Sequence, residues 1–318
     1  ETGATLGKLR FRQFVFHCQW QELKTYANER GVLLFGDMPI YVHLESPDVW
    51  AHQEQFQLDE YGQPITVTGV PPDYFSAQGQ LWGNPQYDWQ HMLDSGFDWW
   101  LLRFKSAAQM FDMVRIDHFR ALEAYWEIPA TATTAREGRW VHTPGRELLN
   151  LVRRQCPRLH LVAENLGIIS PEVEELRREF RLPGMLIMQF AFDGNPENTY
   201  LSHRHEQNEF VYSGTHDYDT SLGWFQGLDK DTRERVCEYF RCTPADMPWA
   251  VIAEVMASRA TTAIIPWQDF LALDGSHRMN TPGTTEGNWH WRFDWDQVPA
   301  DLSGRIHRLV ANNNRLPT

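Results

Sequence analysis

The sequence lacks three features that would each point to a particular class of partner. No glycine-rich phosphate loop follows any of its strand-like segments, so nucleotide binding is unsupported. No apolar run approaches the roughly 18 residues of a membrane-spanning helix, and no signal-peptide pattern is visible. The net charge is −13, which nucleic acid and anionic membranes would repel. We therefore expect neither nucleic acid nor a membrane as a partner.

Cysteine is also scarce, and the four cysteines are scattered without the spacing of metal ligands. We predict that all are free thiols in a reducing compartment, the cytoplasm: Cys18, Cys156, Cys237 and Cys242. The only tight histidine pair, His203 and His205, lies in a polar segment. We expect no metal and no cofactor. A metal-dependent barrel hydrolase stays an alternative, because aspartate, glutamate and histidine are also cation ligands.

What is present describes a globular protein that is rich in tryptophan. Of 318 residues, 42% are apolar and 22% are charged, which is typical of one large domain or two ordinary ones. The chain has 14 tryptophans, a high content. Aromatic side chains are a common platform for sugar rings, although any single tryptophan is as well explained by the filling of a large core.

Short apolar strands alternate with amphipathic helices along the chain. The pattern predicts helices over 14–31, 98–111, 145–156, 170–180, 230–240 and 248–258. It predicts six strands, over 32–42, 113–119, 159–167, 184–192, 209–217 and within 261–271. Alternation of this kind indicates parallel βαβ units in an α/β protein. Two architectures compete, a doubly wound open sheet and a (β/α)8 TIM-type barrel.

Polar residues gather at the carboxyl ends of several predicted strands, where a (β/α)8 barrel builds its active site. They are Asp37, Asp117, Glu164, and His216 with Asp217. This placement favours the barrel, although six strands are two fewer than eight. Either two strands escape the pattern or the chain lacks them. Residues 43–96 read as a loop-rich insertion, and a loop of that length in a compact domain is usually functional.

Three of these carboxylates, those of Asp117, Glu164 and Asp217, suggest glycoside chemistry. Burial and mutual repulsion would raise the pKa of one carboxyl group, and an adjacent arginine would keep another ionised. Arg115 precedes Asp117 by two residues and so shares its strand face. A retaining glycosidase needs such a pair, a nucleophile and a general acid/base. One Arg-x-Asp alone is as readily a buried ion pair, but three such strand ends in a chain with aromatic-rich loops favour a site.

Seven segments, in order along about residues 14–296, carry a resemblance to a known family. They are "GDMPIYV", "PPDYFSAQGQLWGNP", "VRIDHFRALEAYWEIP", "VAENLGIISPEVEELR", "LPGMLIMQFAFDG", "YSGTHDYDTSLGWF" and "RMNTPGTTEGNW". Together they resemble amylomaltase, the 4-α-glucanotransferase related to the α-amylase clan. The resemblance implies a (β/α)8 barrel in which this chain supplies strands three to eight. Residues 1–318 would then be the C-terminal portion of a catalytic barrel in a longer chain, lacking strands one and two.

The resemblance implies roles for individual residues. Asp117 matches the nucleophile, Glu164 the general acid/base, and Asp217 the transition-state stabiliser. Asp37 matches a strand-three carboxylate of the clan. The implied substrate contacts are Arg115, His118, His216, Asp73, Gln80, Trp82 and Asn280. Two positions depart from the family pattern, Asn165 after the acid/base and Tyr218 after "THD".

The implied reaction transfers α-1,4-glucan segments from a maltodextrin donor to glucose or another maltodextrin. Residues 73–85 would form a lid that excludes water, with Gly79 and Gly83 as hinges. Two alternatives remain at this point. One is an amylase-like α-glucan hydrolase, because the catalytic carboxylates are the same for water and for sugar acceptors. The other is a catalytically silent fragment that at most binds glucan.

Overall fold

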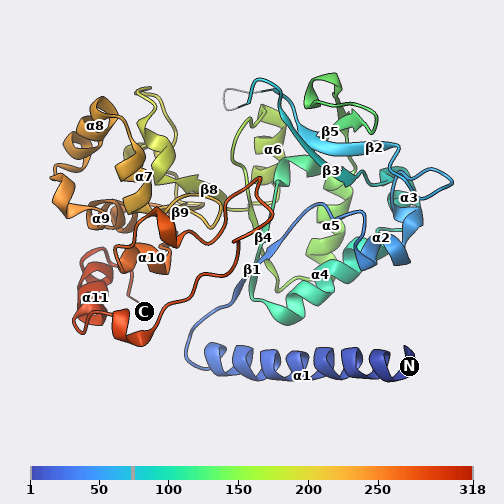
Figure 1. Ribbon diagram of the computed structural model, residues 1–318, viewed down its shortest axis with the longest axis horizontal. Coiled ribbons are helices and arrows are strands. Elements are labelled where there is room, and N and C mark those ends of the chain that lie inside the picture. The colour runs from blue at the N-terminus through green and yellow to red at the C-terminus, as the bar shows by residue number, and fades with distance from the viewer. Residues whose placement is uncertain (1, 73–75, 317–318) are drawn as a thin grey trace. The chain divides into compact units, whose positions relative to one another are not determined.

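The computed structural model describes residues 2–72 and 76–316, and the chain divides into two compact units, Glu1–Pro183 and Gly184–Thr318. Each unit is built on a three-stranded parallel sheet (Figure 1). The first sheet has the order β1-β4-β7 and the second the order β10-β9-β8. Their bounds are β1 (Phe35–Met38), β4 (Met113–Ile116), β7 (His160–Ala163), β8 (Gly184–Ile187), β9 (Glu209–Tyr212) and β10 (Thr262–Ile264). The six strands predicted from the sequence are confirmed, as is the α/β class.

The parallel sheet of the first unit is buried against helices of the same unit. These are α4 (Asp98–Met110), α5 (Gly145–Gln155) and α6 (Pro171–Glu179). Val114 and Ile116 of β4 and Ala163 of β7 are almost fully buried, which explains their apolar character. The register pairs Ile116 with Ala163, so both strands end at the same level. The residues that follow them are therefore neighbours at one edge of the sheet.

A second, antiparallel sheet in the first unit corrects the sequence prediction. It has the order β3-β2-β5-β6 and consists of β2 (Thr66–Val70), β3 (Gln80–Pro85), β5 (Ala124–Pro129) and β6 (Arg139–His142). The segment 43–96, expected to be rich in loops, thus contributes β2 and β3 together with α2 (Pro47–Ala51) and α3 (Trp89–Asp94). Glycines and prolines hid these strands. Gly69 is required in β2, because a Cβ there would lie 2.2 Å from the carbonyl oxygen of Gln80.

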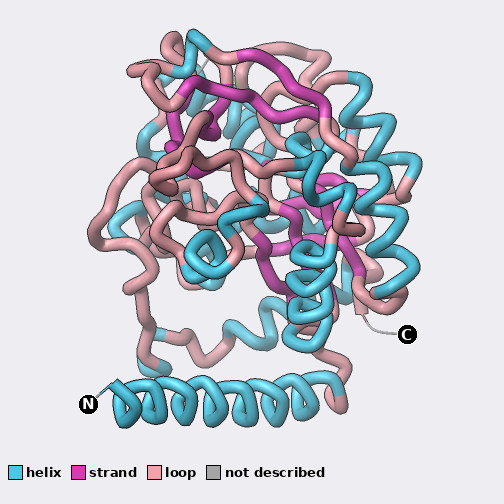
Figure 2. Tube along the Cα trace, turned by 90° about the vertical axis from the view of Figure 1, so that its right-hand side faces the viewer, coloured by secondary structure: helices cyan, strands magenta, loops and turns pink. Residues whose placement is uncertain are grey.

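The first helix, α1 (Thr2–Asn28), is the long helix next to the N-terminal end in Figure 2. It begins twelve residues earlier than the predicted start at residue 14. Side-chain hydrogen bonds from its last turns fasten it to the end of α4 and to the residues just before β4. Trp20 Nε1 donates to the Met110 carbonyl at 2.8 Å, and Lys24 Nζ donates to the Phe111 carbonyl at 2.9 Å. Asn28 Nδ2 donates to Asp112 Oδ2 at 2.9 Å. These bonds hold the C-terminal part of α1, whereas its N-terminal part exposes Leu6, Leu9, Phe11, Phe14 and Phe16.

Short helices lie beside the parallel sheet of the second unit (Figure 1). They are α7 (Ser221–Gly227), α8 (Lys230–Phe240), α9 (Trp249–Ala257), α10 (Trp267–Phe270) and α11 (Leu302–Asn312). Val211 of β9 and Val251 and Val255 of α9 are fully buried in its core. α8 and α9 were predicted. α7 and α10 were not, because they have only seven and four residues. α11 was missed although its apolar residues Leu302, Ile306, Leu309 and Val310 recur at helical spacing.

Two further predictions concern the whole chain. All four cysteines are free thiols, as expected. Among the described residues, no helix combines the length and the apolar character needed to cross a membrane.

The packing of α5 gives a test of the first unit. A Cβ on Gly145, the first residue of α5, would lie 1.8 Å from the Leu122 carbonyl oxygen, so Gly145→Ala must displace the helix. We expect the substitution to lower the free energy of unfolding by about 2–3 kcal/mol in chemical denaturation of the full-length protein.

Gly7→Ala is the matched control, because nothing lies within 4 Å of a Cβ at that helical position. It should raise the free energy of unfolding by about 0.5–1 kcal/mol. Equal effects of the two substitutions would contradict the packing described for α5.

Candidate functional site

An arginine between two aspartates occupies the carboxyl end of the first unit's parallel sheet. Arg115 Nη1 lies 2.8 Å from both carboxylate oxygens of Asp37, and Arg115 Nη2 lies 2.7 Å from Asp117 Oδ1. The register explains the first contact, since Asp37 of β1 pairs with Arg115 of β4. The second contact confirms that Arg115 and Asp117 lie on the same face. Sequence reasoning had placed Asp37 at this edge but had not paired it with Arg115.

The Arg115 side chain is only 10% exposed, so its charge depends on these partners. Burial alone would lower the pKa of Arg115. The carboxylates of Asp117, Asp37 and Glu164 outweigh that effect and raise its pKa above the usual value. The guanidinium is therefore a fixed cation, and its two bonded nitrogens fix where the Asp37 and Asp117 carboxylates lie.

Glu164, the residue after β7, is buried, with 8% of its surface exposed. Two backbone amides hold its carboxyl group. The His118 amide donates to Oε2 and the Leu166 amide donates to Oε1, both at 2.7 Å. Burial, assisted by the negative charge of Asp117, raises the pKa of Glu164 to about 7, although Arg115 and the two amides oppose the shift. Near neutral pH this carboxyl group is thus present in both protonation states.

Asp117 and Glu164 stand side by side within the first unit. The Glu164 amide donates to the Ile116 carbonyl at 3.1 Å, and the Phe119 amide donates to the Glu164 carbonyl at 3.1 Å. Neighbouring strands in a sheet lie about 4.8 Å apart. This spacing is close to the roughly 5–5.5 Å that separates the two carboxyl groups of a retaining glycosidase. His118, which directly follows Asp117, takes a left-handed backbone conformation with a φ of 52°. The arrangement offers one carboxyl group held by an arginine and one poised to exchange a proton.

An aromatic wall adjoins these carboxyl groups. The Trp82 ring meets the His118 ring edge-on at 4.8 Å between centroids, and Tyr41 lies 6.2 Å from Trp82. Trp82 Nε1 donates to Gln80 Oε1 at 3.1 Å, and 40% of the Trp82 surface is exposed. The structure therefore brings the predicted residues Gln80, Trp82 and His118 together. Tyr41 belongs to the same wall and was missed, although it stands in the "GDMPIYV" segment.

The predicted lid needs a correction. Residues 80–85 are the strand β3, paired with β2, so this half of segment 73–85 is not a loop. Gly79 and Gly83 have positive φ values of 69° and 81°, which suits glycine, but they flank or interrupt a strand. Asp73, predicted to contact substrate, lies outside the described residues.

In the second unit, the loop after β9 carries the other predicted carboxylate. Asn280 Nδ2 donates to Asp217 Oδ1 at 2.8 Å, and His216 Nε2 lies 3.3 Å from Asp217 Oδ2. Arg278 Nη2 donates to the Asp217 carbonyl at 3.1 Å. The His216 ring lies 5.2 Å from the ring of Trp289. Arg278 and Trp289 were missed, and the signal for both was their place in the "RMNTPGTTEGNW" segment.

A pocket of about 280 Å³ opens beside this loop, within the second unit. His216, Tyr218, Arg278 and Trp289 are among its lining residues. Tyr218, one of the two departures from the family pattern, packs edge-on against Phe190 with ring centroids 4.9 Å apart. Its side chain thus forms part of the pocket wall, where it can alter the shape available to a ligand.

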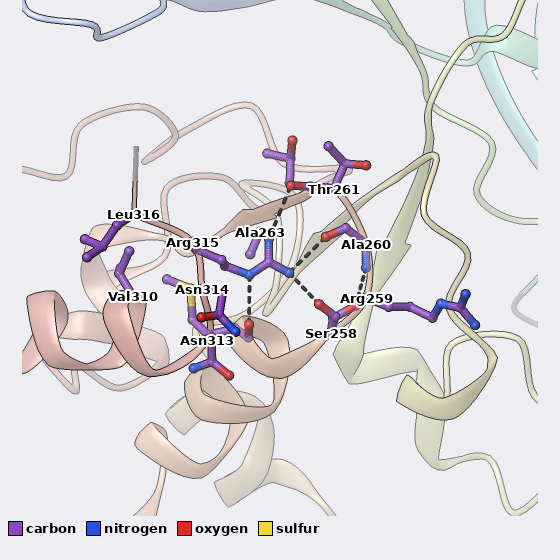
Figure 3. A pocket seen from close by; sticks show the side chains of 12 residues that line it. Ser258, Arg259, Ala260, Thr261, Ala263, Val310, Asn313, Asn314, Arg315 and Leu316 are labelled. Atoms are coloured by element: carbon purple, nitrogen blue, oxygen red, sulfur yellow. Dashed lines mark hydrogen bonds between the residues drawn. The ribbon is translucent and has the colours of Figure 1, made fainter. Parts of the chain in front are cut away.

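A second pocket of this unit, of about 500 Å³, has a structural explanation (Figure 3). The Arg315 guanidinium is part of its wall and donates to the carbonyls of Met256, Ser258, Ala260 and Thr261, at 2.8, 2.6, 2.9 and 3.2 Å. These carbonyls end α9 and lead into β10, so Arg315 caps the helix. In the part of the chain that the structure describes, no cluster of histidine, cysteine or carboxylate side chains could hold a metal ion.

Comparison with known proteins agrees with the sequence resemblance. A family model described as 4-alpha-glucanotransferase matches residues 3–297. The 4-alpha-glucanotransferase of Synechocystis sp. is 48% identical over 301 residues, which cover 93% of this chain and 60% of that protein. The 4-alpha-glucanotransferase of Thermus thermophilus is 44% identical over 315 residues, which cover 96% of this chain and 63% of that protein. The chain thus spans about 60% of the length of these relatives.

Solved structures resemble the chain as well. The amylomaltase from Streptococcus agalactiae, solved in complex with acarbose, is 39% identical with a TM-score of 0.91, and the match covers 96% of this chain and 62% of that one. An alpha-amylase from Lactobacillus plantarum, 17% identical with a TM-score of 0.53, shares the fold alone. With a family model that matches almost the whole chain, and with relatives of this similarity, the chain belongs to the 4-alpha-glucanotransferase family.

Proposed function

We propose that this protein transfers α-1,4-glucan segments between maltodextrins by a retaining double displacement. One observation carries the proposal. Buried Glu164, with a pKa of about 7, stands beside an aspartate that Arg115 holds in place. That combination supplies a proton donor and a nucleophile at neutral pH. Membership of the 4-alpha-glucanotransferase family supports the choice of substrate.

In the proposed first step, an Asp117 oxygen attacks the anomeric carbon of the donor glucan. Protonated Glu164 gives its proton to the glycosidic oxygen, and the shortened glucan leaves with a free 4-hydroxyl group. The product is a glucosyl ester of Asp117 and an ionised Glu164. Arg115 favours this step by fixing the attacking carboxylate, and the Glu164 pKa favours it by leaving a proton available at neutral pH.

In the proposed second step, the 4-hydroxyl group of glucose or another maltodextrin replaces the leaving fragment. Glu164 removes the hydroxyl proton while the oxygen attacks the anomeric carbon, and the Asp117 ester breaks. Glu164 is protonated again, so the cycle closes without a cofactor. Water in place of the sugar would give hydrolysis.

The remaining site residues are proposed to hold substrate. Trp82 and Tyr41 present an aromatic wall on which a sugar ring can stack. Burial, followed in effect by the Arg120 cation, lowers the pKa of His118 to about 3, so its imidazole is neutral at neutral pH and can bond a hydroxyl group. We assign transition-state stabilisation to Asp217. The predicted substrate contacts of Arg115, His216, Asp73, Gln80 and Asn280 also stay proposals.

We also propose that the six parallel strands are strands three to eight of a (β/α)8 barrel, with residues 1–318 as its C-terminal portion and 43–96 as an insertion. The parallel pairing and the likeness to the amylomaltase fold support this assignment. A cytoplasmic location is a further proposal that the free thiols favour, although the Arabidopsis relative is named chloroplastic/amyloplastic.

The product spectrum from maltotriose tests the function. The full-length protein should convert it to glucose and to maltodextrins longer than maltotriose, as chromatography would show. Asp117→Asn should lower kcat by about 10⁴-fold or more, because it removes the nucleophile. New reducing ends without longer products would favour the hydrolase. No turnover at all would favour a protein that only binds glucan.

The pKa of Glu164 predicts the pH dependence. With maltotriose, kcat/KM should fall as pH rises through about 7, because the first step needs protonated Glu164. Glucosyl fluoride needs no proton donor for its leaving group, so its kcat/KM should lack that limb. Glu164→Gln should react with the fluoride but scarcely with maltotriose. An identical alkaline limb for both donors would contradict the acid role.

The raised pKa of Glu164 should also make the free energy of unfolding depend on pH. Its pKa rises from 4.5 to about 7 on folding, so the folded state binds the proton more tightly. Below about pH 4.5, wild type and Glu164→Gln should differ little. The variant should then become relatively more stable as pH rises to about 7, by on the order of 3 kcal/mol. A stability difference that does not change with pH in denaturant titrations would contradict the raised pKa.

A further inference from the structure

A buried aspartate in the second unit accepts three hydrogen bonds. Asp269 lies in α10 and is fully buried. The Ser213 and Ser221 hydroxyl groups both donate to its Oδ2, at 2.6 and 2.7 Å, and the Ser221 amide donates to its Oδ1 at 2.7 Å. Both serines are also fully buried. One carboxylate therefore satisfies three donors that water cannot reach.

The two serines are the ends of one functional segment. Residues 213–221, "SGTHDYDTS", contain His216 and Asp217, and Ser213 directly follows β9. Ser221 begins α7. Asp269 thus closes this loop on itself by bonding both its first and its last residue. The loop's two ends are tied through a side chain that comes from a different part of the chain.

The same helix also fastens the segment that reaches Asp217 from the other direction. Gln268, next to Asp269, donates from Nε2 to the His277 carbonyl at 3.3 Å. His277 ends a short 3-10 helix, Gly275–His277, directly before Arg278 and Asn280. That segment packs closely on α7, because a Cβ on Gly223 would lie 2.6 Å from the Gly275 amide nitrogen. The two backbones can approach this closely because residue 223 is a glycine, whereas a Cβ on Gly275 would meet the Asp219 carboxylate at 2.8 Å.

We propose that Asp269 is a positioning residue that fixes the loop 213–221 and so sets the position of the Asp217 carboxylate and the His216 imidazole. The inference rests on the proposed function for the effect on rate, but the clamp itself does not. The proposal gives Asp269, in the "WQDF" segment of α10, a role beyond packing. A small misplacement of a group that acts on the transition state can cost about 10²-fold in rate.

The three donors explain why an acid stands at this position. An apolar residue of similar size would leave the Ser221 amide and two hydroxyl groups buried without partners. An asparagine can still accept from the Ser221 amide and can donate to the hydroxyl oxygens. A graded response to substitution therefore follows from the geometry.

Kinetics on the full-length protein test the proposal. Asp269→Ala should lower kcat for maltotriose by about 30–100-fold with little change in KM, because the clamp acts on the reacting step. Asp269→Asn should recover most of that loss. If Asp269→Ala does not fold, Ser213→Ala, which removes one donor and leaves the carboxylate in place, should lower kcat by about 3–10-fold.

Ser258→Ala is the matched control. Ser258 is a buried serine of the same unit whose hydroxyl group bonds His205 Nδ1 at 2.8 Å and accepts from the Ala260 amide at 3.1 Å. Its removal should destabilise the unit to an extent similar to Ser213→Ala while kcat stays unchanged. The proposal is overturned if kcat is the same in wild type and in every variant, Asp269→Ala, Asp269→Asn, Ser213→Ala and Ser258→Ala.

Hydrogen exchange separates the clamp from the catalytic assignment. The amides of 213–221 should exchange about tenfold faster in Asp269→Ala, or in Ser213→Ala, than in wild type or Ser258→Ala. Unchanged exchange in that loop overturns the clamp whatever the activity. If exchange in the loop is faster in the variants but the wild type does not turn over maltotriose, the clamp is supported and the proposed function is contradicted.

Discussion

The site in the first unit depends on one buried arginine. Arg115 is nearly inaccessible to water, and such a charge is tolerated only because the carboxylates of Asp37 and Asp117 bond it directly. The parallel register of β1 and β4 creates this contact, since it sets Asp37 opposite Arg115. The register of β4 and β7 pairs Ile116 with Ala163 and so places Glu164 beside Asp117. Strand pairing, more than any loop, therefore decides where the chemical groups lie.

The protein treats its buried carboxyl groups in different ways, and the difference follows from the donors each one meets. Glu164 receives two backbone amides, yet burial prevails and raises its pKa to about 7. Asp269 receives three donors, and burial again raises its pKa above the usual value. Glu164 faces an aspartate and is proposed to exchange a proton, whereas Asp269 faces serines and is proposed to hold a loop. Similar burial thus serves two purposes.

The sequence predicted much of this because its signals were local. Six apolar strands and the polar residues at their ends could be read from short segments such as 113–119. Two strands of the antiparallel sheet were missed because β2 carries Gly69 and β3 carries Gly83, where glycine normally indicates a turn. The Arg115 to Asp37 bond and the Asp269 clamp join residues 78 and 48–56 positions apart, so no local pattern could reveal them. Long-range register and burial are what the structure adds.

Trapping the covalent intermediate tests the central claim most directly. A fluorinated glucosyl donor that slows the proposed second displacement should leave a sugar attached to the protein, and mass spectrometry of the digested protein would locate it. The account predicts the label on Asp117, the carboxylate that Arg115 holds at 2.7 Å. A label on Glu164 or on any other carboxylate would contradict it.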